Sequence, residues 1–137
     1  MQHKRRFSAF VASGDDPRSA IVDATDFARE FMTSAGLSTK AKVKALVVIE
    51  ELVSNVLRHK DPAQDVNLTL SLDTENDEVL LELDDDSVAF DASLNQAFAG
   101  PDPERGGSVG LAIVRAWGTN MRYDRKDGRN LLALTVK

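Results

Sequence analysis

Four segments of the sequence alternate apolar and polar residues, and they come in two consecutive pairs. In the first pair, residues 66–72 and 79–83 alternate on either side of a polar stretch at 73–77. In the second pair, residues 121–136 alternate on both sides of a Lys-Asp-Gly-Arg stretch at 126–129. A period of two is typical of half-buried strands, and short polar turns join strands that pair antiparallel. The sequence therefore predicts two hairpins in a mostly antiparallel sheet.

Two longer segments have apolar residues at the three- and four-residue spacing of helices. The first, residues 16–36, begins with an Asp-Pro pair that suits a helix start and ends on a glycine. The second, residues 38–59, begins with a serine that can cap it. The pattern of residues 6–12 predicts a first strand with apolar residues on both faces. Such a strand can be covered on both faces by other parts of the protein. This order favours an α+β fold, with helices on one face of the sheet.

The composition excludes several classes of protein. A chain of 137 residues fits one compact domain, so we expect residues 1–137 to form a single domain. The net charge of -5 argues against general attraction to nucleic acid or anionic lipid, despite the basic run at 4–6. No stretch approaches the roughly 20 apolar residues of a membrane-spanning helix. Zero Cys excludes disulfides and thiolate chemistry. We expect a cytoplasmic protein that binds neither membrane nor nucleic acid.

One row of the second predicted helix changes from apolar to polar residues. Val43, Val47, Glu51, Asn55 and His59 are each four residues apart, so they share one face. Such a change marks either the mouth of a cleft or the end of burial. Glu51 and Asn55 could supply a general base and an oxygen ligand for Mg2+, or they could be a solvated or N-capping pair.

Two further segments carry candidate binding chemistry. The acidic run Asp84-Asp85-Asp86 at the end of a strand could bind a cation, accept a hydrogen bond from an exocyclic amine, or end the strand in water. Glycines at 106, 107 and 110 precede an apolar helix at 111–117, which suits phosphate binding or a flexible turn. The sequence contains neither a P-loop nor a dinucleotide-binding fingerprint.

Taken in order, these pieces resemble the ATP-binding domain of the GHKL superfamily, which includes gyrase and the histidine kinases. The Glu-Asn helix comes first, the hairpin that ends in the acidic run follows, and the glycine-rich segment comes last. Over residues 5–137 the sequence looks most like the bacterial anti-sigma-factor serine/threonine kinases. The resemblance implies a Bergerat-type fold, a two-layer α+β sandwich with a mostly antiparallel sheet under helices on one face.

The resemblance also implies a site for ATP and Mg2+. In it Glu51 acts as the catalytic base, Asn55 holds the metal, and Asp85 contacts the amino group of adenine. A loop at 95–105 would close as a lid. The ATP-binding residues implied are Asn55, Asp85, Ser87, Arg105, Gly106, Gly107, Ser108, Val109, Gly110 and Leu111. The sequence departs from the family pattern at Ser87, Ala89 and Ser108, where glycine is common, and an added Cβ restricts the backbone or crowds the ligand.

By resemblance, the protein is expected to be an ATP-dependent serine/threonine kinase that acts as an anti-sigma factor. It would phosphorylate an anti-anti-sigma protein, sequester a sigma factor and form a homodimer built partly on the first strand. Two alternatives remain open from the residues. One is a non-catalytic regulatory module with a degenerate ATP site, and the other is an ATPase that needs no protein acceptor.

Overall fold

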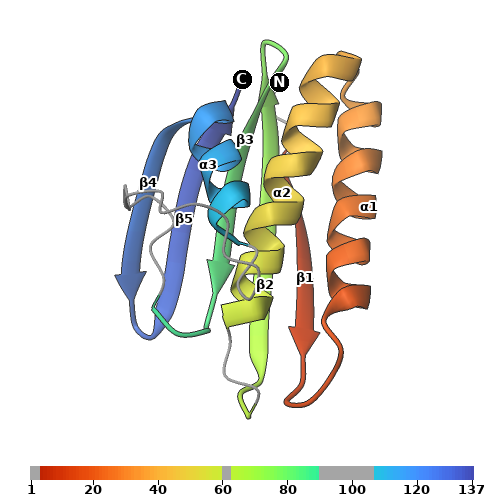
Figure 1. Ribbon diagram of the computed structural model, residues 1–137. Coiled ribbons are helices and arrows are strands. Elements are labelled where there is room, and N and C mark those ends of the chain that lie inside the picture. Colours follow the sequence, from red (N-terminus) through yellow and green to blue (C-terminus); the bar gives the residue numbers. More distant parts are fainter. Residues whose placement is uncertain (1–3, 60–62, 90–106) are drawn as a thin grey trace.

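The computed structural model describes residues 4–59, 63–89 and 107–137, which form a sheet with helices against one face (Figure 1). The elements in chain order are β1 (Arg5–Val11), α1 (Arg18–Ser34), α2 (Thr39–His59), β2 (Val66–Glu75), β3 (Glu78–Asp85), α3 (Gly107–Trp117), β4 (Gly118–Lys126) and β5 (Arg129–Val136). The sheet has five strands in the order β1-β2-β3-β5-β4, and every neighbouring pair is antiparallel. The predicted α+β class and antiparallel sheet are confirmed.

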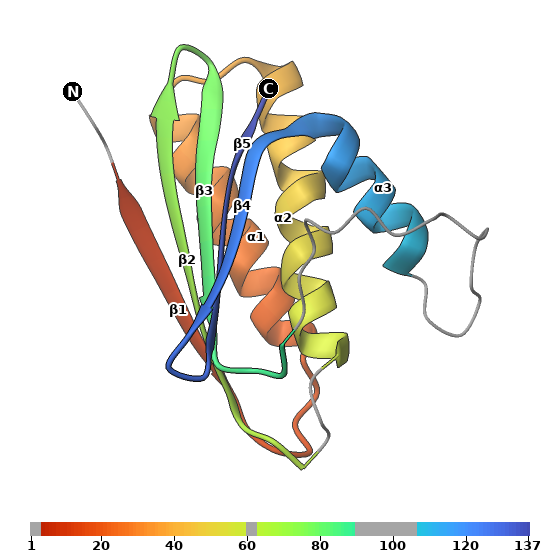
Figure 2. The ribbon, with the colours of Figure 1, turned by 90° about the vertical axis from the view of Figure 1, so that its left-hand side faces the viewer.

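The core lies between the sheet and the helices. Figure 2 shows the sheet nearly edge-on, with all three helices on the same side of it. Alternate residues of β2, including Leu68, Leu70 and Leu72, are buried against α1 and α2. Each such leucine contributes about 1.5–3 kcal/mol of hydrophobic stabilisation relative to an exposed side chain. The alternation of apolar and polar residues in the sequence therefore indicates which face of the strand the helices cover.

The first strand is covered on one side only within the part of the chain described. Phe7 and Ala9 pack against the core, and Phe7 stacks on Phe27 of α1 with ring centroids 5.6 Å apart. Phe10 points to the other face and is 59% exposed. Cover on both sides, which the sequence pattern allowed, is therefore absent among the described residues. Because β1 lies at the edge of the sheet, it also has an unpaired side.

The helix boundaries agree with the predicted start and stop signals to within a residue or two. The helix α1 begins at Arg18, whose backbone N–H donates to Asp16 Oδ1 at 2.9 Å, and Gly36 follows its end with φ of +74°. The backbone N–H of Ala41 donates to Ser38 Oγ at 3.1 Å, so Ser38 caps α2 as predicted. Both hairpins turn through two residues with left-handed backbone angles, so the strands extend into stretches predicted as turns.

The cap of α2 is tied to the first hairpin by a carboxylate. Asp77 accepts hydrogen bonds from the backbone N–H of Ser38 at 2.7 Å and from its hydroxyl at 2.6 Å. These side-chain and backbone bonds lower the pKa of Asp77. A carboxylate whose pKa is lowered on folding stabilises the protein above its unfolded pKa, and this contribution is lost as the pH falls through the folded pKa.

Replacing Asp77 by Asn is therefore expected to make the protein less stable at neutral pH and to reduce its loss of stability on acidification. Urea unfolding at neutral pH and below the ordinary aspartate pKa of 3.8 measures both effects. Asp127→Asn is the matched control, because Asp127 has the same left-handed conformation in the β4–β5 turn but accepts no side-chain hydrogen bond from described residues. Equal pH dependence of wild type and Asp77→Asn would contradict this role.

No helix in the described part of the chain is long and apolar enough to cross a membrane.

Candidate functional site

Along the α2 row, the polar residue Asn55 is more buried than the apolar beginning. Val43 is 53% exposed, whereas Asn55 is 2% exposed and lines a pocket between α2 and the sheet. The alternative that this row marks the end of burial is therefore wrong, and so is the alternative of a solvated or N-capping pair, because Asn55 lies buried within the helix. The prediction of a cleft agrees with the position of Asn55.

Three buried polar atoms of this row have no hydrogen-bond partner among the described residues. They are Oε2 of Glu51 and both the Oδ1 and the Nδ2 of Asn55. A buried polar atom without a partner costs about 1–3 kcal/mol of folding free energy, so such atoms are rare. An amide with both ends unpartnered, one helical turn from a carboxylate, is the arrangement expected of residues that hold a ligand.

The helix α3 approaches this carboxylate through a glycine. A Cβ placed on Gly110 would overlap the Glu51 carboxylate, so only glycine fits there in this arrangement. Gly110 is not among the described glycines with positive φ. Glycine is therefore needed at this position for lack of space for a side chain, and not for its backbone conformation. Closeness of backbone to a functional carboxylate is one of the uses of glycine.

The glycine-rich segment differs from its predicted form. We expected a turn ahead of a helix at 111–117, but α3 already begins at Gly107, so residues 107–110 form its first turn. Within this first turn, Gly110 packs directly against Glu51. Leu111 packs on the core. The side chains of Ser108 and Val109 lie outside the described part of the structure, as do the whole of Arg105, Gly106 and the predicted lid at 95–105.

Asp85 lies at the end of β3 and is 3% exposed. Its Oδ1 accepts hydrogen bonds from the backbone N–H of Ser87 at 3.0 Å, from the hydroxyl of Ser87, and from Nδ2 of Asn130 at 3.0 Å. Ser87 does not appear among the described residues with positive φ. Serine is thus accommodated at this family-glycine position without left-handed strain, and its hydroxyl helps to orient the carboxylate.

The three aspartates of the acidic run have different partners. Asp84 pairs with Arg129 Nε at 2.7 Å, while Asp86 accepts from the backbone N–H of Asn67 at 2.7 Å and from Asn67 Nδ2 at 3.0 Å. Burial raises the pKa of Asp86, but the bonds from Asn67 and the charge of Arg129 outweigh it, so the net pKa is lowered. Because the three carboxylates diverge, they do not form a cation site, and no cluster of His, Asp or Glu within the described ranges could hold a metal.

Sequence reasoning missed three residues around Asp85. Asn130 is directly opposite Asp85 in the β3–β5 pairing, and its Oδ1 accepts from the Tyr123 hydroxyl and, at 2.9 Å, from Arg125 Nη1. One signal was available. Asn130 occupies the core-facing position of β5 that Leu132 and its alternate neighbours continue, so a polar residue there is unexpected.

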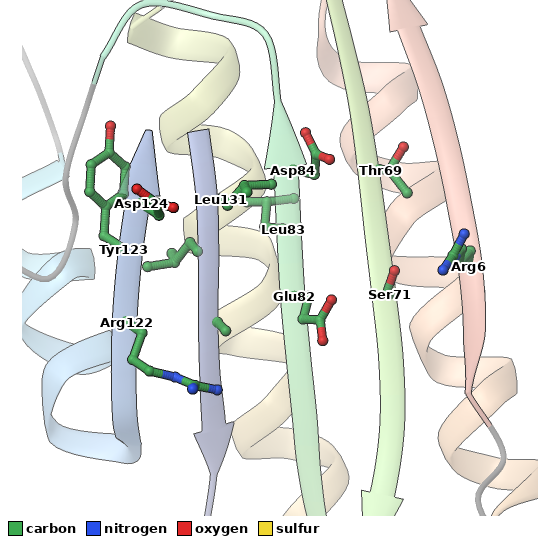
Figure 3. A pocket seen from close by; sticks show the side chains of 12 residues that line it. Arg6, Thr69, Ser71, Glu82, Leu83, Asp84, Arg122, Tyr123, Asp124 and Leu131 are labelled. Atoms are coloured by element: carbon green, nitrogen blue, oxygen red, sulfur yellow. The ribbon is translucent and has the colours of Figure 1, made fainter. Parts of the chain in front are cut away.

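The pocket and a larger hollow lie on opposite faces of the sheet. The pocket is narrow and is lined by Leu52, Asn55, Val56, Leu83, Asp85, Tyr123, Asn130 and Leu132. The hollow, of about 550 Å³, lies on the open face among side chains such as Arg6, Ser71, Glu82 and Arg122 (Figure 3). None of the predicted site residues lines it. The candidate site residues are therefore on the helix side, although the open face has the larger hollow.

The described side chains suit a nucleotide with its metal. Asn55 offers an unpartnered amide oxygen, and amide oxygens are ligands that Mg2+ accepts. Asp85 offers an acceptor in the lining of the narrow pocket, which suits a base carrying an amino group. Gly110 leaves room for close approach of α3 to Glu51. The structure thus brings together Glu51, Asn55, Asp85, Ser87 and Gly110 around one side of the sheet.

Comparison with protein families identifies a related family. The sequence matches the family described as the histidine kinase-like ATPase domain over residues 15–136. A search of curated proteins finds no match.

Proposed function

The chain belongs to the family of histidine kinase-like ATPase domains, and from this premise we propose that it binds Mg-ATP between α2 and the sheet and transfers the terminal phosphoryl group to a Ser or Thr hydroxyl of a partner protein. The match spans residues 15–136, so it includes every segment that carries a proposed site residue. An ATP-dependent function of the kinase or ATPase type follows from the family, and the protein acceptor is the proposal.

One observation carries this proposal. Buried and unpartnered polar atoms gather at Asn55 and Glu51, on the stretch of α2 that faces Gly110 and the pocket. The described residues leave these atoms unsatisfied, so a ligand that bonds them recovers free energy that the described part of the chain does not. A nucleotide with its metal offers the oxygen and cation chemistry that these atoms need.

Each residue has a separate role in the proposed reaction. The amide oxygen of Asn55 holds the metal, and Asp85 accepts a hydrogen bond from the base. Glu51 orients the attacking hydroxyl and accepts its proton, which is general base catalysis. When bound, Mg2+ neutralises charge on the phosphates, and phosphoryl transfer depends mainly on such neutralisation and on positioning. The proposed phosphate-binding residues are Arg105, Gly106, Gly107, Ser108, Val109, Gly110 and Leu111.

The proposed biological role rests on the resemblance to anti-sigma-factor kinases. In this role the acceptor is an anti-anti-sigma protein, the second partner is a sigma factor, and both are met in the cytoplasm. A homodimer built partly on β1 is supported by the exposed Phe10 and by the unpaired side of this edge strand.

The alternative is a regulatory module with a degenerate ATP site, which the serines in place of glycine would favour. The described position of Ser87 supports the active site over this alternative. Its hydroxyl donates to Asp85 Oδ1 and its backbone is not left-handed, so the substitution leaves the acceptor in place.

Thermal unfolding with and without Mg-ATP tests the proposal. A ligand that binds only the folded state adds about 2.7 kcal/mol of stability at 100 times its dissociation constant, so we expect a raised Tm with Mg-ATP and a smaller rise when EDTA removes Mg2+. Labelled γ-phosphate should then appear on a co-encoded acceptor protein. An unchanged Tm at millimolar Mg-ATP would contradict the proposal and favour the regulatory module.

A further inference from the structure

A chain of hydrogen bonds connects the outer strand β4 to Asp85 through Asn130. The hydroxyl of Tyr123 and, at 2.9 Å, Nη1 of Arg125 both donate to Oδ1 of Asn130. Nδ2 of Asn130 then donates to Asp85 Oδ1 at 3.0 Å and to the carbonyl oxygen of Val88 at 2.8 Å. Figure 3 shows Tyr123 and Arg122 as successive residues of β4, on whose continuation Arg125 lies.

The donors on β4 determine which way the Asn130 amide faces. A side-chain amide has an acceptor end and a donor end, and the two are distinguished by their partners. Two donors meet its oxygen, and one of them is a guanidinium, so a flipped amide would place its NH2 group against Tyr123 and Arg125. The flip would also direct the amide oxygen toward the carboxylate of Asp85. The contact of the NH2 group with the Arg125 guanidinium and the contact of the amide oxygen with the Asp85 carboxylate are both repulsive, so Arg125 keeps Nδ2 on Asp85. The Tyr123 hydroxyl, which can donate or accept, adds a second bond to Oδ1.

The orientation of Asn130 in turn holds the carboxylate of Asp85. Oδ1 of Asp85 already accepts from Asn130 and twice from Ser87, whereas no described residue donates to its Oδ2. A carboxylate has only acceptor sites. Asp85 and Asn130 both line the narrow pocket. The carboxylate of Asp85 therefore accepts hydrogen bonds from a ligand and offers it none.

The same network clamps the chain that follows β3. Arg125 Nη1 donates to the carbonyl oxygen of Ser87 at 3.0 Å, beside the bond from Asn130 to Val88. The β4–β5 hairpin and the segment at 86–88 are thus joined by these two bonds, one from Arg125 and one from Asn130. Arg125 is in this way bonded to Ser87, which donates to Asp85 through its backbone N–H and its hydroxyl.

We propose that Tyr123 and Arg125 are positioning residues which act through Asn130 to hold Asp85 as a fixed acceptor, and so make the pocket select a 6-amino purine over a 6-oxo purine. This inference rests on the proposed function, because it concerns the base of the same nucleotide. A 6-oxo group would face the carboxylate of Asp85, which can only accept and whose Oδ2 receives no hydrogen bond from a described residue. Without the two residues on β4, Oδ1 of Asn130 loses both of its donors, so the amide and the carboxylate that it holds become less fixed and discriminate less against a 6-oxo base.

Competition binding with ATP and with inosine triphosphate, which differ at position 6 of the purine, tests the inference. The variants are Tyr123→Phe, which removes one hydroxyl, and Tyr123→Phe combined with Arg125→Met. We expect the ratio of the inosine triphosphate Kd to the ATP Kd to fall by about tenfold or more in the double variant, since hydrogen bonds to charged groups are strong. The single variant should show a smaller fall. Arg122→Met is the matched control, because Arg122 lies on the same strand but lines the open face.

The outcomes separate this inference from the proposed function. If the wild type binds neither nucleotide, the proposed function fails and the inference fails with it. If the wild type prefers ATP and the double variant keeps the same preference, the inference alone fails. An equal loss of affinity for both nucleotides would also overturn it, since it would indicate a merely structural role.

A spectroscopic readout supplements the binding ratio. Tyr123 is the only tyrosine of the sequence, so its ring resonances can be followed individually by NMR. In the wild type they should shift when ATP binds, and Arg125→Met should move them in the absence of nucleotide. Arg122→Met should leave them close to the wild-type positions. Tyr123 resonances that respond to neither ATP nor Arg125→Met would overturn the proposed connection.

Discussion

Replacing Glu51 by Gln is expected to lower the rate of phosphoryl transfer by about 10²–10⁴-fold, the usual contribution of general base catalysis. The substitution keeps the size and shape of the side chain, and Gln still offers an oxygen at the position near Gly110. It removes the group that accepts the proton of the attacking hydroxyl. Binding of Mg-ATP should therefore change much less than the rate.

Transfer of labelled γ-phosphate measures the rate, and the Tm shift with Mg-ATP measures binding. Glu50→Gln is the matched control, because Glu50 is the preceding residue of α2 but is exposed. Transfer by Glu50→Gln should equal that of the wild type. Full activity of Glu51→Gln would exclude Glu51 as the base. Equal release of free phosphate with and without the acceptor protein would instead favour an ATPase that needs no protein acceptor.

Replacing Asn55 by Leu is expected to stabilise the protein without nucleotide and to abolish its response to Mg-ATP. Leu has the same branched skeleton of heavy atoms as Asn, with two larger methyl groups, and it removes two buried polar atoms that have no partner among the described residues. The expected gain in the free energy of unfolding is about 1–3 kcal/mol, the usual penalty of one such buried group. The metal ligand is lost at the same time. A gain in stability with a loss of function is typical of a residue kept for its chemistry.

Urea unfolding in the absence and presence of Mg-ATP measures both effects. Asn130→Leu is the matched control, since Asn130 is also buried but its amide is bonded at both ends. That substitution should destabilise the protein, because it leaves polar groups of Asp85 and Tyr123 without a partner. If Asn55→Leu destabilised the protein as Asn130→Leu does, the view of Asn55 as a ligand-binding residue would be wrong.

Local patterns in the sequence were sufficient for the elements and for one wall of the site. Alternation at 66–72 and 79–83 predicted a hairpin because a strand covered on one face repeats every two residues. The four-residue spacing of Glu51 and Asn55 placed both on one face of a helix because an α-helix has 3.6 residues per turn. Both inferences used only the local sequence and required no information about which distant residues pack against these segments.

The other wall of the site depended on pairing between distant segments. Asn130 meets Asp85 because β5 pairs with β3 in a register that puts these residues opposite each other. The strands β3 and β5 are not consecutive in the chain, so no short turn between them determines that register. The tight approach of Gly110 to Glu51 likewise depends on how α3 packs on α2.

The helices, the hairpins and the Glu-Asn spacing can thus be read directly from the chain, because each reflects a repeat of the backbone over a few residues. Three features of the site exist only after folding. They are the burial of Asn55, the hydrogen bonds that orient Asp85, and the close approach to Glu51 that leaves room only for glycine at position 110. They arise from contacts between residues far apart in the chain, whose geometry depends on the packing of the whole sheet against its helices.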